Sequence, residues 1–590
     1  MKASTVPLLG VAAAATAYAS PNHGPAAAHT RIQVPLSLPT RPLVKDVYGY
    51  SVEPVWLDSY LETDLFSNLM GVIAQVAGKP PPIRVGGNTA DQTYLHPDQD
   101  QPSFSEPNAT AAVNFNISGA WYGTWADYFP DGTDIIYTLN FRDNRTAWAN
   151  ALAQAEAVHR ALGPKLRMFE LGNEIDHFIN KGWRDETWGV HSYIDQWRNL
   201  TQQIVASDWY QDAAAASEEG APKFQAAVFA DPPWVPDQHD EIDDMDIVNL
   251  TRAGLADDPL IETYCVHMYP QSTCDTERWY RMRLDLLSDH SVLWRNVSQY
   301  VPQVAAADDA GAHLVMGETN SASCSGHSGI SDTFGAALWA VDYVLLSASI
   351  GMRKVYFHLG AQSEYSAFTP LPYELKGERL EPGIRAPWYA HYFLAHVVSG
   401  EDSDGELSVA QLPGANASDL SGFGIWGPDS SLRKLVLLDM GVWNASSGLS
   451  NPSTLSASDS ASRSSGTRPT RRFEIQVPWA NGTAVEALRL SAPGTNAKSA
   501  VDVSGVTFDA RDGGSVIGEP EWEAFKVVSG TVSFEVPRAG GILLQVGSAV
   551  GGGGGGGGDG ETPPVAGAGR SVVLAKWVVL AAVLAPVLML

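Results

Sequence analysis

The stretch RMFELGNE, residues 167–174, decides the fold class of this chain. Read with a period of two, it is a short, largely apolar strand that ends at Asn173 and Glu174. The preceding residues 146–162 carry apolar side chains at helical spacing, and a Gly-Pro pair ends that helix. Within a helix–strand alternation, a carboxylate at the C-terminal end of a strand is typical of the functional end of a (β/α)8 barrel. The stretch therefore predicts such a barrel, with Glu174 at its mouth.

A second stretch, HLVMGETN at residues 313–320, repeats this design and ends near Glu318. Strand-like segments alternate with helical patterns such as residues 57–77, 190–206, 277–303 and 333–350. The strand candidates are residues 47–52, 82–86, 134–141, 167–174, 224–230, 261–269, 313–320 and 354–360. Between the second and third of them, residues 108–131 indicate a loop with one short helix. The alternation predicts an α/β fold, a (β/α)8 TIM barrel over residues 46–395.

The pattern changes after about residue 395. Short alternating strands separated by Gly, Pro and Asp predict a C-terminal β-sandwich domain over residues 396–550. Inside it, the Ser-rich residues 444–469 lack large apolar side chains, so we expect a disordered surface insertion there. Residues 31–40 alternate like a strand but precede the barrel. We therefore expect the N-terminal segment 20–45 to complete the sandwich.

The N-terminus predicts secretion. Lys2 precedes an apolar run, and the small-residue site before Ser20 indicates that residues 1–19 are a signal peptide. Glycosylation acceptors of the Asn-x-Ser/Thr type agree with passage through the secretory route. The candidates are Asn108, Asn116, Asn144, Asn199, Asn249, Asn296, Asn416, Asn444 and Asn481. We expect a secreted glycoprotein.

The C-terminus predicts a lipid anchor. In residues 551–590 a Gly-rich tether and a polar spacer precede an apolar run, which is the order of a GPI-attachment signal. The candidate ω sites are Gly558, Asp559 and Gly560. The alternative is an ordinary transmembrane helix. That reading fits less well, because the run is of minimal length, contains Lys576 and has no basic anchor after it. We therefore expect attachment to the membrane at the cell surface or wall.

The net charge limits the kinds of molecule that this protein is expected to bind. A formal net charge of -28 argues against nucleic acid and against long polyanions as partners.

The three cysteines allow two readings: Cys265 pairs with Cys274, or Cys324 pairs with one of those two and joins the loops after two barrel strands. Their spacing is not that of a metal site, and we expect neither a metal nor another cofactor.

The two strand-end glutamates suit the cleavage of a glycosidic bond. That reaction needs one carboxyl to protonate the leaving oxygen and another to meet the developing oxocarbenium ion. Asn173 precedes Glu174, and its amide can bind a sugar hydroxyl. Gly317 precedes Glu318 and would let a sugar ring approach closely. Carbohydrate is therefore the expected substrate.

Here the sequence resembles glycoside hydrolase family 79, the fungal-type β-glucuronidases of the clan A retaining glycosidases. The resemblance is carried by residues 171–174 (LGNE), 317–321 (GETNS), 84–91 (RVGGNTAD), 266–270 (VHMYP) and 329–339 (GISDTFGAALW). It runs from about residue 31 to 547. It implies that Glu174 is the acid/base and Glu318 the nucleophile, and that Asn88 and Asp91 support the site.

Retention requires the two carboxyl groups to lie about 5 to 5.5 Å apart. Two anions at that distance repel, so we expect the pair to titrate as a unit, with the proton on Glu174. Arg84 would keep Glu318 ionised, and Tyr269 would orient it. The alternatives are a barrel-core ion pair for Arg84, simple packing for Tyr269 and a satisfied core histidine for His267.

The resemblance also implies that donors from two places bind the carboxylate of the sugar. One is a tyrosine after strand eight, here Tyr365. The other is the loop after Glu318, which lacks the tyrosine expected there. Its candidate donors are Ser325, His327 and the backbone N–H groups around Gly326 and Gly329. A solvent-exposed loop histidine is the alternative for His327.

From these features we predict a retaining, exo-acting β-glucuronidase that works by double displacement. The alternatives are an endo-acting heparanase-like enzyme, a transglycosylating wall-remodelling enzyme and a non-catalytic surface protein that binds glycans. The endo-acting reading fits less well, because a sulfated chain would meet a net negative surface. The binding protein fits less well because it would not need both glutamates.

Overall fold

The computed structural model describes residues 29–106, 114–142, 146–216, 221–231, 245–275, 280–360, 362–375, 378–400, 405–447 and 462–547. The predicted signal peptide, Gly-rich tether and anchor signal lie outside these residues, as do Asn108, Asn144 and most of the Ser-rich insertion. Within the described part, no helix is both long and apolar enough to cross a membrane.

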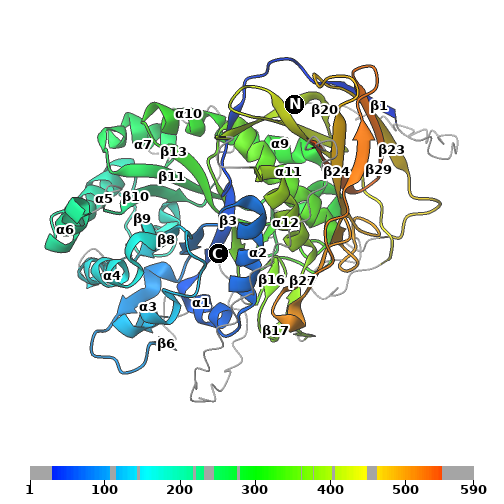
Figure 1. Cartoon of the computed structure of the whole chain (residues 1–590). Coiled ribbons are helices and arrows are strands. Elements are labelled where there is room, and N and C mark those ends of the chain that lie inside the picture. The colour runs from blue at the N-terminus through cyan, green and yellow to red at the C-terminus, as the bar shows by residue number, and fades with distance from the viewer. Residues whose placement is uncertain are drawn as a thin grey trace, which may run out of the picture.

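Eight parallel strands form a closed barrel, which confirms the predicted fold class. Around the barrel the strands follow chain order (Figure 1). They are β3 (Tyr48–Val52), β4 (Ile83–Val85), β8 (Ile135–Leu139), β9 (Leu166–Leu171), β10 (Lys223–Phe229), β11 (Ile261–Met268), β13 (His313–Thr319) and β15 (Val355–Leu359). Each predicted strand overlaps one of them. The carboxyl ends of all eight strands therefore meet at one mouth.

The helices pack outside the barrel through apolar stripes. In α2 (Leu65–Ala77) the buried positions Leu65, Phe66, Leu69, Met70 and Ile73 recur at helical spacing. Gly78 ends the helix in the left-handed region, with φ of 84°. The other long helices are α4 (Thr146–Leu162), α5 (Val190–Val205), α11 (Phe334–Ile350) and α12 (Ala386–Val398).

Two helical predictions need correction. The single helix expected over residues 277–303 is divided into α8 (Leu284–Leu287), α9 (His290–Val297) and α10 (Val301–Asp309). The reason is local capping: the Asp289 carboxylate accepts the amides of Ser291 and Val292 and starts α9, and a proline stands at the start of α10. The pattern over residues 57–77 likewise forms two helices, α1 (Pro54–Leu61) and α2.

The insertion after β4 is more ordered than expected. Its predicted short helix is α3 (Gly119–Trp125). A small sheet, β5 (Thr93–Leu95), β7 (Asn114–Ile117) and β6 (Ser103–Glu106), was not expected. The acceptor Asn116 lies in this sheet, buried, with its amide oxygen on His96. Asn249 is also buried, beside Asp246, so the fold presents neither asparagine to solvent.

The C-terminal domain is a two-sheet β structure, as predicted. Its larger sheet runs in the order β2-β20-β21-β22-β30-β24-β25, and its smaller sheet is β1-β23-β29. The N-terminal segment completes both: β1 (His29–Gln33) pairs with β23 (Thr470–Gln476), and β2 (Arg41–Leu43) pairs with β20 (Leu407–Ala417). Figure 1 shows β1 beside β23 and far from β3, the first strand of the barrel. Ile32, Phe473 and Ile475 lie in the core between the sheets.

A buried polar network joins the barrel to this domain. Asp342 of α11 contacts the His290 ring at 2.8 Å and accepts the Ser421 hydroxyl of β21 (Leu420–Trp426) at 2.6 Å. Gln411 of β20 contacts the other ring nitrogen of His290 at 2.6 Å. Burial alone would lower the pKa of His290, but Asp342 raises it above the usual value. The network therefore carries an ion pair at acidic pH.

This network should make stability depend on pH. Because the folded-state pKa of His290 is raised, its contribution is complete below the unfolded value and is lost as pH rises through the folded value. Asp342→Asn should therefore lower the free energy of unfolding more at pH 5 than at pH 9, by a difference of about 1–3 kcal/mol. Urea unfolding at both pH values measures it. Exposed Asp512→Asn is the control, and an equal loss at both pH values would refute the ion pair.

Candidate active site

Glu174 lies just beyond the end of β9, where the backbone turns sharply. Gly172 has φ of 77°, and a Cβ there would lie 2.9 Å from the Cβ of Phe141. Glu174 itself is left-handed, with φ of 52° and ψ of 57°, and it starts the 3-10 helix Ile175–His177. A non-glycine residue in this region costs of order 1–3 kcal/mol and persists only where neighbours fix it. The turn gives Glu174 a strained but defined place at the barrel mouth.

Asp91 supports this turn from beneath. Its fully buried carboxylate accepts the backbone amides of Asn173 at 2.8 Å and Phe141 at 2.7 Å. Burial raises the pKa of Asp91 to about 6, although the two amides oppose that rise. Asp91 is therefore a support of the loop that carries Glu174, and its buried position leaves no room for contact with a ligand.

Glu318 lies on β13 and is held by two donors. The Tyr269 hydroxyl donates to Oε1 at 2.8 Å, and the Arg84 guanidinium donates to Oε2 at 3.0 Å. Both contacts match the predicted geometry. A Cβ on Gly317 would point into the barrel interior and lie 2.2 Å from Cys265 Sγ. The expectation that Gly317 makes room for a sugar ring is therefore wrong.

Arg84 is completely buried and fills both of its predicted roles. It forms a core ion pair with Glu170 at 2.6 Å and also contacts Glu318. It donates to Asn173 Oδ1 at 2.7 Å and to the Ser51 hydroxyl at 2.9 Å. Because Oδ1 of Asn173 is occupied, the amide is oriented. Its buried Nδ2 has no partner among the described residues and is free to donate to a ligand.

The carboxylate oxygens of Glu174 and Glu318 approach each other within 4.8 Å, with His267 Nδ1 in the same cluster. Burial alone would raise the pKa of Glu318, but His358, His267 and Arg84 hold it below its usual range. Burial would raise that of Glu174 too, but His267, Lys181 and His177 lower it. Both carboxyl groups therefore have neighbours that favour their ionised forms, and the proton expected on Glu174 stays a prediction.

Lys181 and His177 are the neighbours of Glu174 that sequence reasoning missed. Lys181 Nζ lies 3.6 Å and His177 Nδ1 3.8 Å from Glu174 Oε2, while His267 Nδ1 lies 3.4 Å from Oε1. Asn88 accepts from Lys181 Nζ at 2.7 Å, so it positions this lysine. His267 is therefore more than a core histidine. Both missed residues follow Glu174 closely in the chain, but nothing in the sequence shows that the loop folds back.

Glu53 is a third carboxylate at the mouth that was not predicted. It follows β3 and accepts the Thr89 amide at 3.1 Å. A Cβ at Gly87 would lie 2.6 Å from Glu53 Cγ, which explains a glycine there. Burial raises the pKa of Glu53, and the charges of His358 and Glu318 also act on it. Its position directly after the first barrel strand is the signal that could have found it.

Tyr365 and the loop after Glu318 meet, as the predicted carboxylate site requires. The Ser325 carbonyl accepts the Glu364 amide at 2.7 Å. Gly326, with φ of 80°, lies so close that a Cβ would be 2.7 Å from the Tyr365 amide nitrogen. The rings of Tyr365 and Tyr269 are 6.2 Å apart. This places Tyr365 and Ser325 beside the group that holds Glu318.

Three predicted donors of this loop are already engaged or covered. The Gly326 amide donates to the Ala322 carbonyl at 3.1 Å, and the Gly329 amide donates to Asp332 at 2.7 Å. His327 is fully buried, with its backbone amide on the Ser331 hydroxyl, so the solvent-exposed alternative is wrong. Ser325 is partly exposed. Tyr365 and Ser325 therefore stay predicted carboxylate donors.

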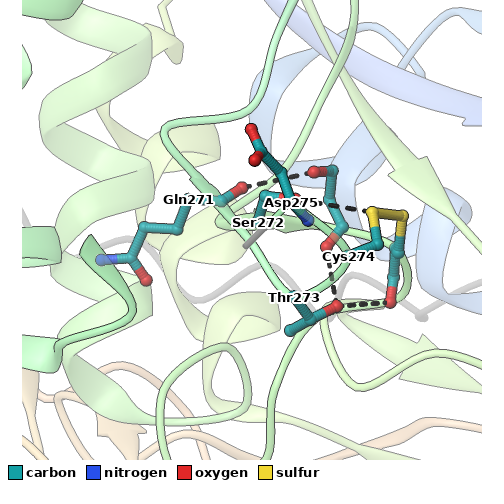
Figure 2. Close-up of a disulfide and its surroundings, with 7 residues drawn as sticks. Gln271, Ser272, Thr273, Cys274 and Asp275 are labelled. Carbon is teal, nitrogen blue, oxygen red and sulfur yellow. Dashed lines mark hydrogen bonds between the residues drawn. A yellow bond between two sulfur atoms is a disulfide. The ribbon is translucent and has the colours of Figure 1, made fainter. Parts of the chain in front are cut away.

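A disulfide between Cys274 and Cys324 fixes this loop, which decides between the predicted pairings. It joins the loop after β11 to the loop after β13, where β12 (Gln271–Ser272) pairs with β14 (Ala322–Ser323). Figure 2 shows Thr273 beside the bridge, where its hydroxyl donates to the Cys324 carbonyl at 3.1 Å. Cys265 is free and buried.

The charges argue against a resident metal at the mouth. Glu174, His267 and Glu318 have the donor types and spacing of a metal site, as do Asp176, His177 and Asp231. However, Arg84 and Lys181 already contact the first pair of carboxylates and would repel a cation.

A cavity of about 840 Å³ opens at the opposite end of the barrel. Its charged lining is paired internally, for example Lys354 with Asp46 at 2.7 Å.

The barrel with a C-terminal sandwich and two facing carboxylates defines a glycoside hydrolase. Residues 422–543 match the Glycosyl hydrolase family 79 C-terminal beta domain. The β-glucuronidase of Neurospora crassa is 26% identical over 571 residues, covering 88% of this chain and 95% of that protein. The β-glucuronidase of Aspergillus niger is 25% identical over 529 residues, covering 85% and 89%. These matches support the resemblance to glycoside hydrolase family 79.

Solved structures support the fold. The crystal structure of a 4-O-α-L-rhamnosyl-β-D-glucuronidase from Fusarium oxysporum aligns with a TM-score of 0.68 at 22% identity. The alignment covers 88% of this chain and 100% of that one. An α-L-arabinofuranosidase from Thermotoga maritima aligns with a TM-score of 0.53 at 12% identity, covering 88% and 99%. The likeness spans both the barrel and the sandwich.

The buried Arg84 should be essential for stability as well as for the site. Arg84→Met leaves Glu170 buried without its cation, so the free energy of unfolding should fall by about 3–5 kcal/mol. Adding Glu170→Gln should recover part of the loss. Arg433→Met, which breaks the exposed pair with Asp429, is the matched control and should cost less than about 1 kcal/mol. Urea unfolding measures all four proteins. Equal losses for Arg84→Met and Arg433→Met would contradict this account.

Proposed function

We propose that this protein is a retaining, exo-acting β-glucuronidase that removes terminal β-linked glucuronic acid from glycans or glycoconjugates. The observation that carries the proposal is the pair Glu174 and Glu318, whose oxygens come within 4.8 Å at the mouth of the barrel. Inverting enzymes separate their carboxyl groups by about 6.5–9.5 Å to admit water. The shorter distance between Glu174 and Glu318 therefore favours retention. The two fungal relatives that span most of this chain are β-glucuronidases, which favours this sugar.

In the first half of the reaction, Glu318 attacks the anomeric carbon while Glu174 gives its proton to the departing glycosidic oxygen. The contacts of Glu318 suit a nucleophile, because Arg84 keeps it ionised and Tyr269 fixes its direction. In the second half, Glu174 takes a proton from water, the water oxygen attacks the anomeric carbon, and the bond to Glu318 breaks. Glu174 ends protonated and Glu318 ends ionised, as each began.

Asn173 and Tyr365 would bind the sugar. The Asn173 amide is held by Arg84 with its Nδ2 available, so it can donate to a hydroxyl next to the anomeric carbon. Burial raises the pKa of Tyr365 well above its usual value, so its hydroxyl keeps the proton it donates. A charged acceptor strengthens such a hydrogen bond. Tyr365 and Ser325 together would recognise the carboxylate of glucuronate.

The reaction and its stereochemistry can be tested on aryl glycosides with residues 20–550. We expect hydrolysis of the β-glucuronide over the matched glucoside, galactoside and xyloside. Glu318→Gln should abolish it, and Glu174→Gln should slow it by about 10²–10⁴-fold. Proton NMR of the first product should show the β-anomer.

Each other outcome has a meaning. A first-formed α-anomer would refute double displacement. Cleavage of a neutral sugar alone would refute the proposed carboxylate site. With folded protein, no hydrolysis of any aryl glycoside would favour the endo-acting or binding alternatives, and transfer to added sugars would favour transglycosylation.

The role of Tyr365 can be tested separately. Tyr365→Phe removes one donor to a charged group, a loss worth about 1.5–3 kcal/mol. The ratio of kcat/KM for glucuronide to that for glucoside should therefore fall by about 10- to 100-fold. Ser325→Ala should act in the same direction. An unchanged ratio in both variants would place carboxylate recognition elsewhere, while the rate on glucoside reports whether the site is intact.

For location, we propose a secreted enzyme held at the cell surface or wall by a lipid anchor. This rests on the terminal sequences alone, with the ω site among Gly558, Asp559 and Gly560. Release of the full-length protein from membranes by a phosphatidylinositol-specific phospholipase is the expected result. Retention after that treatment would favour the transmembrane alternative.

A further inference from the structure

His177 is brought back onto Glu174 by the short 3-10 helix that follows β9. The His177 amide donates to the Glu174 carbonyl at 3.0 Å, which closes the turn. Ring nitrogen Nδ1 of His177 then lies 3.8 Å from Glu174 Oε2. The other ring nitrogen, Nε2, lies 3.2 Å from the Asp231 carboxylate. One imidazole therefore links the proposed acid/base to a carboxylate on the neighbouring loop.

An irregular strand end brings Asp231 to this place. In β10, Ala227 and Val228 have φ of 77° and 63°, and the pairing with β11 shifts register there. Left-handed backbone at a β-branched residue is unusual, and a bulge of this kind re-aims the residues that follow. Beyond it, the amides of Ala230 and Asp231 donate to Asp176 at 3.0 and 2.9 Å. The loops after β9 and β10 thus interlock through Asp176 and His177.

The charges around His177 favour its cationic form. It faces Glu174 and Asp176 on its own loop and Asp231 from β10. Burial would lower the pKa of His177, but Asp231, Asp176 and Glu174 raise it to about 9. Glu174 in turn faces His267 of β11, Lys181 of its own loop and Glu318 of β13. Besides facing Glu174, His177 contacts a carboxylate of another loop, that of Asp231.

We propose that His177, held by Asp231, is a positioning residue that sets the upper pH limit of catalysis by stabilising the ionised form of Glu174. The inference rests on the proposed function, in which Glu174 must carry a proton to start the reaction. A cation beside Glu174 lowers the pH at which that proton is lost. His177 and Asp231 therefore confine the protonated form of Glu174, and with it catalysis, to acidic conditions.

The sign of the effect can be worked out directly. The alkaline limb of kcat/KM reports the loss of the proton from the acid of the free enzyme. Removing a positive charge within about 4–6 Å raises the pKa of a carboxyl by roughly 1–3 units. His177→Gln should therefore move the alkaline limb upward by about one pH unit or more. Asp231→Asn should move it in the same direction, since His177 then loses the partner that keeps it charged.

The experiment is the pH profile of kcat/KM for 4-methylumbelliferyl β-glucuronide, measured on residues 20–550. His177→Lys restores a positive charge and should return the limb toward the wild-type position. His191→Gln, an exposed histidine on α5, is the matched control and should not shift it. The acidic limb, which reports Glu318, should stay in place in all variants. Thermal unfolding of each variant separates a pH effect from loss of structure.

A phenyl glucuronide and a 2,4-dinitrophenyl glucuronide sharpen the test. The first has a poor leaving group and needs the acid, whereas the second needs it little, so the shift should appear for the first and shrink for the second. An alkaline limb unmoved in both His177→Gln and Asp231→Asn would overturn the inference. An equal shift in His177→Lys would also overturn it, because charge would then not be the cause. Failure of the proposed function looks different, because the wild type itself would then not hydrolyse glucuronides.

Discussion

The site depends on one buried cation. Arg84 lies at the centre of the barrel with no exposed surface, and it contacts Glu170, Glu318, Asn173 and Ser51. A buried guanidinium is stable only when its donors are satisfied, and here three barrel strands, β3, β9 and β13, and the residues directly after β9 supply the acceptors. The position of Glu318 and the orientation of Asn173 follow from that single requirement. The same interaction therefore determines both the stability of the barrel and the geometry of the site.

The sequence predicted what depends on local pattern. The eight strands, the terminal positions of Glu174 and Glu318, and the contacts of Arg84 and Tyr269 with Glu318 were all within its reach, because strand-end residues of a parallel barrel must meet. It failed where a loop folds back or a backbone atom finds an internal partner. His177 and Lys181 required the turn after β9, and the amides of Gly326 and Gly329 required knowledge of Ala322 and Asp332.

The two carboxylates are held in different ways, and the difference suits different roles. Glu318 receives a fixed charge and a hydroxyl that no pH change in the working range removes, and the titratable His358 lies farther away, at 3.5 Å. Glu174 is surrounded instead by histidines and one lysine, at longer distances of 3.4 to 3.8 Å. A nucleophile needs a permanent negative charge, whereas an acid/base must change its charge in every cycle. Titratable neighbours at a distance permit that change, and a close contact with a buried arginine would not.

The two sides of the mouth are accordingly held by different kinds of contact. On the Glu318 side, a disulfide, the β12–β14 pairing and the contact of Gly326 with Tyr365 fix one shape. On the Glu174 side, Asp176 and His177 join the described parts of the loops after β9 and β10 through hydrogen bonds and charge. A glycone pocket must distinguish one sugar from close relatives, which demands a fixed shape. In the proposed function, the leaving-group side must pass a proton and release varied partners, and loops joined by charge can respond to pH where a covalent bridge cannot.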